Sequence, residues 1–244
     1  MLSNKYKERF YRKWINVDDL YSCHLQVEET DIEVLSDRVL EKGFLEETVL
    51  FYRQQIKNYI AKDRRFLVEL KPLEVDINAP SIIKDMAESA KIAGVGPMAG
   101  VSGAIAQYLG ETILKKGIKE LIIENGGDIF LKIRKPRIIG IYAGESKFSG
   151  KIFLKIKPES KICGICTSSA TVSHSLSFGN ADAVTVLAED AILADALATA
   201  CCNRIKEEND FEPTIDFAKK IKGIHGIVII LKDKLASWGE IEFV

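Results

Sequence analysis

A chain of 244 residues is long enough for one large domain or for two fused halves. Its 47% hydrophobic and 28% charged residues are typical of a folded globular protein rather than of a disordered or fibrous one. The 34 basic and 35 acidic residues nearly cancel, so charge gives no support to a nucleic-acid partner or to binding at an anionic membrane surface.

The N-terminal segment, MLSNKYKERFYRKW, has no apolar core of the kind that follows the charges of a secretion signal. No uncharged apolar run of about 18 residues occurs, because Glu189, Asp190 and Asp195 interrupt the longest candidate. We therefore expect a cytoplasmic protein without a membrane span. In that compartment its five cysteines should be mostly reduced thiols.

The first part of the chain changes from strand-like to helix-like patterns. Residues 9–38 alternate polar and apolar positions as strands do, with a turn at Glu28, Glu29 and Thr30. Apolar residues then recur at three- and four-residue steps, which predicts helices. These helices are residues 43–63, a helix entered at Pro80, and residues 98–116, which follow a glycine-rich break at 94–100.

The second part is richer in strands. Strands are predicted at residues 120–124, 128–134, 137–143, 151–157, 161–168, 183–188, 224–232 and 235–244, with helices around 191–200 and at 214–222. This order predicts an α+β fold with mostly antiparallel neighbours. No linker rich in Pro, Gly or Ser separates two domains. We expect one unit of residues 1–244, in which 1–118 and 119–244 are candidates for two similar halves.

The apolar stretch 191-AILADALATA-200 carries Asp195 and Thr199 four residues apart, so both project from one face of a helix. A carboxylate among alanines must be compensated or exposed. A Mg²⁺ ion would compensate it, since this cation takes oxygen ligands and is commonly held by one or two protein groups plus phosphate oxygens. Alternatively, Asp195 caps the helix start and Thr199 bonds back to a carbonyl of its own helix.

Two other segments offer polar groups or bare backbone. In 124-ENGGDI-129, Asn-Gly between strand-like runs predicts a hairpin turn, and the two glycines also leave backbone open to a flat ligand. The segment 163-CGICTSSATVSHSLSFGNAD-182 gathers Ser and Thr hydroxyls around His174. Such donors suit phosphate or carbonyl oxygens, although a solvated loop has the same composition.

A dinucleotide pattern near residue 94 is not supported by its context. The segment 94-GVGPMA-99 matches G-x-G-x-x-A, but helix rather than strand precedes it and Pro97 lies inside the turn. What remains is a glycine-rich entry to a helix N-terminus, which is a modest anion site.

The cysteines suggest a metal centre only weakly. Cys163 and Cys166 form C-x-x-C, but no second pair stands at matching spacing. A centre built from these two with Cys201 or Cys202 is kept as an alternative. Adjacent cysteines in an alanine-rich helix are more often small buried residues.

Four segments, in order, resemble those of the ApbE family, the FAD:protein FMN transferases. They are the helix entry 99-AGVSGAIAQYLGE-111, the turn 125-NGGDI-129, the T-S-G-type segment 167-TSSA-170 and the helix 194-ADALATA-200. The last is the most specific, and the N-terminal third shows no such match. The resemblance implies an ApbE-like, T-fold-like duplicated α+β architecture, with antiparallel sheets, packed helices and the ligand between the halves.

The resemblance also implies a site. Asp195 and Thr199 would be Mg²⁺ ligands, helped by a backbone carbonyl near Gly100–Ser102, and the cation would bridge the carboxylate to a diphosphate such as that of FAD. Asp128 and His174 are the candidate catalytic groups. The implied partner is a small-molecule nucleotide, and a homodimer is one assembly compatible with the sequence. The residues expected to bind the ligand are Gly100, Val101, Ser102, Asn125, Gly126, Gly127, Thr167, Ser168 and Ser169.

Two departures from the flavin transferases bear on activity. Where they carry a lysine in a G-I-A-K-G-type segment, this chain has 100-GVSGA-104, and 173-SHSLSFGNAD-182 stands in place of their H-x-I-D-P-x-T-G segment. The chain is more similar in this respect to an uncharacterised ApbE-related family of archaea and bacteria. Two functions stay open: a Mg²⁺-dependent transferase or hydrolase acting on an FAD-like substrate, and a module that binds a flavin or another nucleotide without turning it over.

Overall fold

The structure is a computed structural model that describes residues 12, 14 and 18–244, except 160, 162 and 173–176. Its centre is an eight-stranded sheet with the order β1-β2-β3-β4-β7-β8-β9-β10, in which all neighbours are antiparallel, and β5 and β6 form a separate hairpin. The strands are β1 (Tyr21–Val27), β2 (Thr30–Ser36), β3 (Leu121–Asn125), β4 (Asp128–Lys132), β5 (Arg137–Gly140), β6 (Phe153–Ile156), β7 (Gly164–Ser168), β8 (Ala183–Ala188), β9 (Ile224–Leu231) and β10 (Lys234–Gly239).

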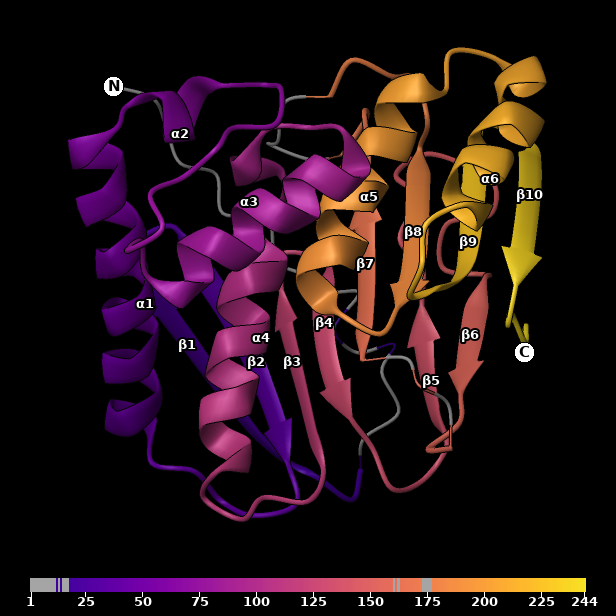
Figure 1. The fold of residues 1–244 in the computed structure, drawn as a ribbon. Coiled ribbons are helices and arrows are strands. Elements are labelled where there is room, and N and C mark those ends of the chain that lie inside the picture. Colours follow the sequence, from indigo (N-terminus) through magenta and orange to yellow (C-terminus); the bar gives the residue numbers. More distant parts are fainter. Residues whose placement is uncertain (1–11, 13, 15–17, 160, 162, 173–176) are drawn as a thin grey trace, which may run out of the picture.

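The helices cover one face of the large sheet (Figure 1). They are α1 (Lys42–Lys62), α2 (Arg65–Val68), α3 (Ser81–Ala93), α4 (Val101–Leu114), α5 (Ala191–Arg204) and α6 (Phe211–Lys219), with 3₁₀ turns η2 (Pro97–Gly100) and η3 (Glu208–Asp210). Helix α4 packs on β3 and β4, and α5 packs on β7 and β8. Because α4 and α5 also contact each other, they bring together segments that are far apart in the sequence.

Strand β3 shows how the two faces of the sheet are used. Successive side chains of a strand point to opposite faces. Leu121 and Ile123 belong to the apolar cluster beneath the helices, whereas Ile122 belongs to a second cluster on the other face. There it packs with residues of the β5–β6 hairpin such as Ile139 and Leu154. The three consecutive apolar residues 121–123 therefore reflect burial on both faces of the sheet.

The predicted α+β class with antiparallel neighbours is confirmed. The first hairpin has its turn where the sequence places it, since Val27 pairs with Thr30. The helix predicted over residues 98–116 begins later, at Val101, because Pro97 opens a 3₁₀ turn before it. The helix predicted at 214–222 is instead Phe211–Lys219, because a capping box starts the helical segment earlier.

The chain contributes to the large sheet from both proposed halves. Strands β1 and β2 come from residues 1–118, and the remaining six strands of the sheet come from 119–244. Since these strands form one continuous sheet, the division into two similar halves stays a prediction. Among the described residues, no helix combines the length and the apolar character that crossing a membrane requires.

Candidate functional site

A cavity of about 1800 Å³ opens where β3 and β7 end and β4 begins, beside α4 and α5. Residues of α1 and α2 line part of its wall, and other parts are lined by residues 139–142, 144 and 145 and by Ser169, Thr171, Val172 and Phe178. Pockets for drug-sized ligands are usually on the order of 300–1,000 Å³. The cavity is therefore large enough for an extended ligand or for two smaller ones.

Helix α5 places the predicted polar pair on the cavity wall. Asp190, not Asp195, caps this helix, because its side chain accepts a hydrogen bond from the Leu193 amide at 2.8 Å. Asp195 and Thr199 both line the cavity. The Thr199 hydroxyl contacts the Ser168 hydroxyl at 3.0 Å. Asp195 therefore does not cap the helix, and the hydrogen bond of Thr199 runs to Ser168 rather than to a carbonyl of its own helix.

Gly103 allows α4 to approach Asp195 closely. The Gly103 amide donates a hydrogen bond to the Asp195 carboxylate at 2.9 Å, and Asp195 is only 7% exposed. A Cβ at Gly103 would lie 2.3 Å from the carbonyl oxygen of Ala191 and 2.9 Å from the Cβ of Asp195. No side chain fits between these helices, so glycine is required here by space.

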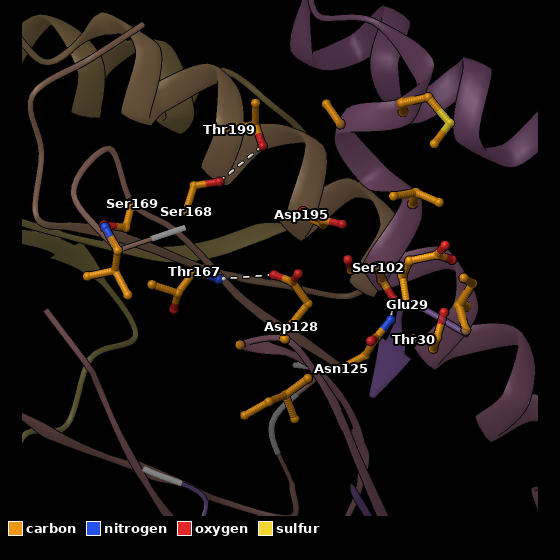
Figure 2. Close-up of a pocket in the computed structure, with 18 of the residues that line it drawn as sticks. Glu29, Thr30, Ser102, Asn125, Asp128, Thr167, Ser168, Ser169, Asp195 and Thr199 are labelled. Carbon is orange, nitrogen blue, oxygen red and sulfur yellow. Dashed lines mark hydrogen bonds between the residues drawn. The ribbon is translucent and has the colours of Figure 1, made fainter. Parts of the chain in front are cut away.

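Asp128 reaches the same region from β4. It follows the turn formed by Gly126 and Gly127, whose φ values of 71° and 101° favour glycine. Its carboxylate accepts a hydrogen bond from the Thr167 amide at 3.3 Å (Figure 2). A Cβ at Gly127 would meet no atom closer than 3.9 Å, so the space above this turn is open.

Asp128 and Asp195 form a buried carboxyl pair, and Figure 2 shows both groups beside the same space. Burial raises the pKa of Asp195 to about 7, although the backbone N–H groups of Gly103 and Ser102 act in the opposite direction. Burial and the charge of Asp195 hold the pKa of Asp128 well above its usual range. In the part of the chain that the structure describes, neither carboxyl group forms an ion pair with a lysine or arginine.

The donor set around this pair fits a hard cation. Mg²⁺ is usually bound by one or two carboxylates, with phosphate oxygens and waters completing its shell. Asp195, Asp128 and the Thr199 hydroxyl supply oxygen atoms on one stretch of the cavity wall. Among the described residues no three His, Cys, Asp or Glu side chains are grouped to hold a metal. Such a site would need oxygens from a ligand to complete it.

Further hydroxyl groups lie next to Thr199. Ser168 and Thr167 end β7, and the Thr167 hydroxyl contacts that of Thr185 at 2.9 Å. The Ser169 hydroxyl accepts hydrogen bonds from the amides of Thr171 and Val172 at 3.1 and 3.0 Å, which holds the chain in a turn. This part of the wall presents hydroxyl and amide groups suited to phosphate oxygens.

A charged network under the Gly126–Gly127 turn was not predicted. Arg12 contacts the Glu124 carboxylate at 2.5 Å and the Asp31 carboxylate at 2.7 Å, and both carboxylates are buried. Glu124 in turn accepts a hydrogen bond from the Gly127 amide at 2.7 Å. Arg12 therefore helps to hold the turn that precedes Asp128. Nothing in the local sequence pattern distinguishes these residues from surface charges.

Of the predicted ligand-binding residues, Gly100 alone does not line the cavity. It is buried against α5, where a Cβ would lie 3.0 Å from the carbonyl oxygen of Ile192, so its role is close packing. His174 lies outside the described residues. The alternative cysteine centre lacks a suitable group among the described residues, since Cys166, Cys201 and Cys202 are free, buried thiols and Cys163 is free as well.

Comparison with known sequences gives a consistent result. Residues 12–235 match the family model described as "AbpE bacteria". The UPF0280 protein MJ1526 of Methanocaldococcus jannaschii is 44% identical over 223 residues, which are 88% of this chain and 89% of that protein. A UPF0280 protein of Methanocella arvoryzae is 41% identical over 216 residues, covering 88% of this chain and 87% of that protein.

Comparison with solved structures matches the fold. The flavin transferase ApbE from Vibrio cholerae superposes with a TM-score of 0.60 over 90% of this chain and 97% of that chain, at 14% identity. The ApbE protein of Thermotoga maritima has a TM-score of 0.60 over 89% of this chain and 96% of that chain, at 15% identity. At these identities the match extends to the fold and not to the chemistry.

Proposed function

This chain belongs to the family described as AbpE bacteria and is related to the UPF0280 proteins of Methanocaldococcus jannaschii and Methanocella arvoryzae, and we propose that it binds a diphosphate-linked nucleotide such as FAD together with Mg²⁺. We further propose that it cleaves the diphosphate, as a transferase or a hydrolase. The fold that it shares with proteins named flavin transferases supports this choice of ligand class.

The strongest support is the buried pair of Asp128 and Asp195 on the wall of the cavity. Two carboxyl groups without a basic partner among the described residues disfavour each other's ionisation. A divalent cation removes this conflict. Its remaining coordination positions then attract the anionic part of a ligand, and a diphosphate is the group that Mg²⁺ most often carries into such sites.

The apolar residues of the cavity support a ligand with ring systems at both ends. The segment at α2 exposes Leu67, Val68 and Leu70, which we name the α2 shelf, and all three line the cavity. Val172 and Phe178 are exposed apolar residues that line it as well. A polar centre with apolar groups on either side suits a dinucleotide better than inorganic diphosphate or a sugar phosphate.

The residues of the site have separate roles in the proposed reaction. Asp195 and Thr199 would hold the Mg²⁺, which supplies charge neutralisation and polarises the bond between the two phosphates. The hydroxyl of an acceptor, or water, attacks the FMN phosphorus, the P–O bond to AMP breaks, and AMP leaves. Asp128 is our candidate to accept the proton of the attacking hydroxyl. The second candidate, His174, lies outside the described residues.

A binding module without turnover is the second candidate function. The segment 100-GVSGA-104 lacks the lysine of the flavin transferases, and residues 173–182 lack their H-x-I-D-P-x-T-G segment. Those departures favour a protein that retains a flavin or another nucleotide for delivery or sensing. In that case Asp195 and Thr199 serve affinity alone.

Release of AMP separates the two functions. The protein is incubated with FAD and Mg²⁺, alone and with a peptide that carries Ser and Thr, and AMP is measured over time. Turnover that Asp195→Ala abolishes supports the enzyme. The matched control is Asp216→Ala, which removes a half-exposed carboxylate of α6 that, among the described residues, pairs with Lys219. Tight FAD binding without AMP supports the module, and an absence of any flavin binding contradicts both.

A further inference from the structure

The polar row on α5 extends beyond the proposed cation site. Asp195, Thr199 and Asn203 follow one another at four-residue steps, and all three line the cavity. Four residues of α-helix advance about 6 Å along the axis. Asn203 therefore lies one turn beyond Thr199, on the side away from Asp195.

Asn203 holds the chain segment that carries Phe178. The Asn203 side-chain oxygen accepts a hydrogen bond from the Phe178 amide at 2.8 Å. The Ser177 hydroxyl donates to the same oxygen at 3.4 Å. The backbone at Phe178 is thus attached to the cavity-facing side of α5, next to the row that ends in Asn203.

The residues after Phe178 are attached to the end of α5 as well. The Asn180 amide donates to the carbonyl oxygen of Ile205 at 2.7 Å. Gly179 lies so close to the helix that a Cβ would stand 1.8 Å from the carbonyl oxygen of Cys202. The backbone from Phe178 to Asn180 is therefore held against α5.

The ring of Phe178 is nevertheless open, with 49% of the residue exposed. An isolated exposed phenylalanine on a protein surface needs no special explanation. This one lines the cavity and is held by a fixed backbone, and the exposed Val172 lines the same cavity. A rigidly placed, half-exposed aromatic face beside a phosphate site is the arrangement used to stack the rings of nucleotides.

We propose that Phe178 stacks on a flat aromatic heterocycle of the ligand whose phosphates lie at Asp195 and Thr199, and that Asn203 positions Phe178 for this contact. This assignment rests on the function proposed above. One helical turn between Thr199 and Asn203, about 6 Å, leaves room for the sugar that separates phosphate from ring in a nucleotide. The α2 shelf then receives the other ring of a dinucleotide.

Ligand binding in the presence of Mg²⁺ tests the assignment, with FAD, FMN and AMP as probes. Removing a stacking aromatic side chain weakens nucleotide binding on the order of 5- to 100-fold, and we expect this loss for Phe178→Ala. Phe178→Trp should keep the affinity, and the emission of the new indole should be quenched by the stacked ring. Phe51→Ala is the matched control, because Phe51 is exposed on α1 and does not line the cavity.

The three probes distinguish the ring that stacks. Weaker FAD and FMN binding with unchanged AMP binding supports stacking of the flavin ring, and weaker FAD and AMP binding with unchanged FMN binding supports stacking of adenine. Equal binding of all three probes to the wild type and Phe178→Ala overturns the assignment while the proposed function stands. Failure of the wild type to bind any probe overturns both.

The role of Asn203 has its own readout. In the Phe178→Trp background, Asn203→Leu should abolish the quenching on ligand binding, because the Phe178 amide loses its acceptor. Asn203→Asp keeps an acceptor oxygen and should retain the quenching. Unchanged quenching in Asn203→Leu overturns the positioning role.

Discussion

Replacing Gly103 with alanine perturbs the proposed site without removing any polar group. The new Cβ would lie 2.3 Å from the carbonyl oxygen of Ala191, whereas ordinary contact begins at 3.4 Å, so α4 and α5 must separate by about 1 Å. That movement strains the hydrogen bond from the Gly103 amide to Asp195. Overpacking and loss of a charged hydrogen bond outweigh the helix preference for alanine, and we expect roughly 2–4 kcal/mol of destabilisation.

Urea unfolding and FAD binding measure the two consequences. Gly43→Ala is the matched control, because a Cβ there would meet no atom closer than 3.9 Å and the change should stabilise the helix by up to about 1 kcal/mol. In Gly103→Ala that is still folded, FAD binding should lose most of its dependence on Mg²⁺, because Asp195 is displaced. A Gly103→Ala protein with wild-type stability and wild-type Mg²⁺ dependence would refute this reasoning.

Three further predictions follow from the packing and the charges. Phe66→Ala should lower the unfolding free energy by about 3–5 kcal/mol, because Phe66 is fully buried. Phe51→Ala should change it little, because Phe51 is exposed, and chemical denaturation of both variants measures the difference. Burial raises the pKa of Cys201 to about 12, so an alkylating agent at neutral pH should label it only after unfolding. Alkylated Cys201 in a mass spectrum of the native protein would contradict this prediction. Hydrogen bonds from Arg137 and Lys135 hold the pKa of Asp19 well below its usual range, so its stabilising effect is complete above the ordinary aspartate pKa and declines as the pH falls from there toward the lower pKa of the folded state. The difference in unfolding free energy between wild type and Asp19→Asn should therefore shrink between pH 6 and pH 3, and a constant difference would speak against the ion pair.

Much of the fold is readable from side-chain periodicity, because each long element has one dominant apolar pattern. Helix α1 shows this, since its predicted bounds of 43–63 differ from Lys42–Lys62 by one residue, and the first hairpin turns where the sequence pattern places the turn. The strand-like pattern of residues 9–38 is less exact, because β1 begins only at Tyr21. Apolar periodicity does not predict the ends of a helix where a short-range hydrogen bond sets them. The capping box at Glu207 and Asp210 starts the 3₁₀ turn η3, which runs directly into α6, and the one-turn helix α2 is too short to show a period.

The candidate site also has residues that the sequence predicts and residues that it does not. Asp195 and Thr199 can be found from sequence, because a carboxylate on an apolar helix needs an explanation. Extending their four-residue spacing would have added Asn203. The contact between Arg12 and Glu124 joins residues 112 positions apart, so no local sequence pattern predicts it. Gly100 was expected to bind the ligand and is found packed against α5, since glycine marks both open backbone and close packing.

The central claim is that Asp195 and Thr199 hold a divalent cation that carries a phosphorylated ligand. Its most direct test is a crystal structure with Mn²⁺ in place of Mg²⁺ and ADP, in which the anomalous signal locates the metal. We predict a metal at about 2.1 Å from a carboxylate oxygen of Asp195 and from the Thr199 hydroxyl, completed by phosphate oxygens. ADP bound in the cavity with the metal elsewhere, or with no metal at all, would contradict the account.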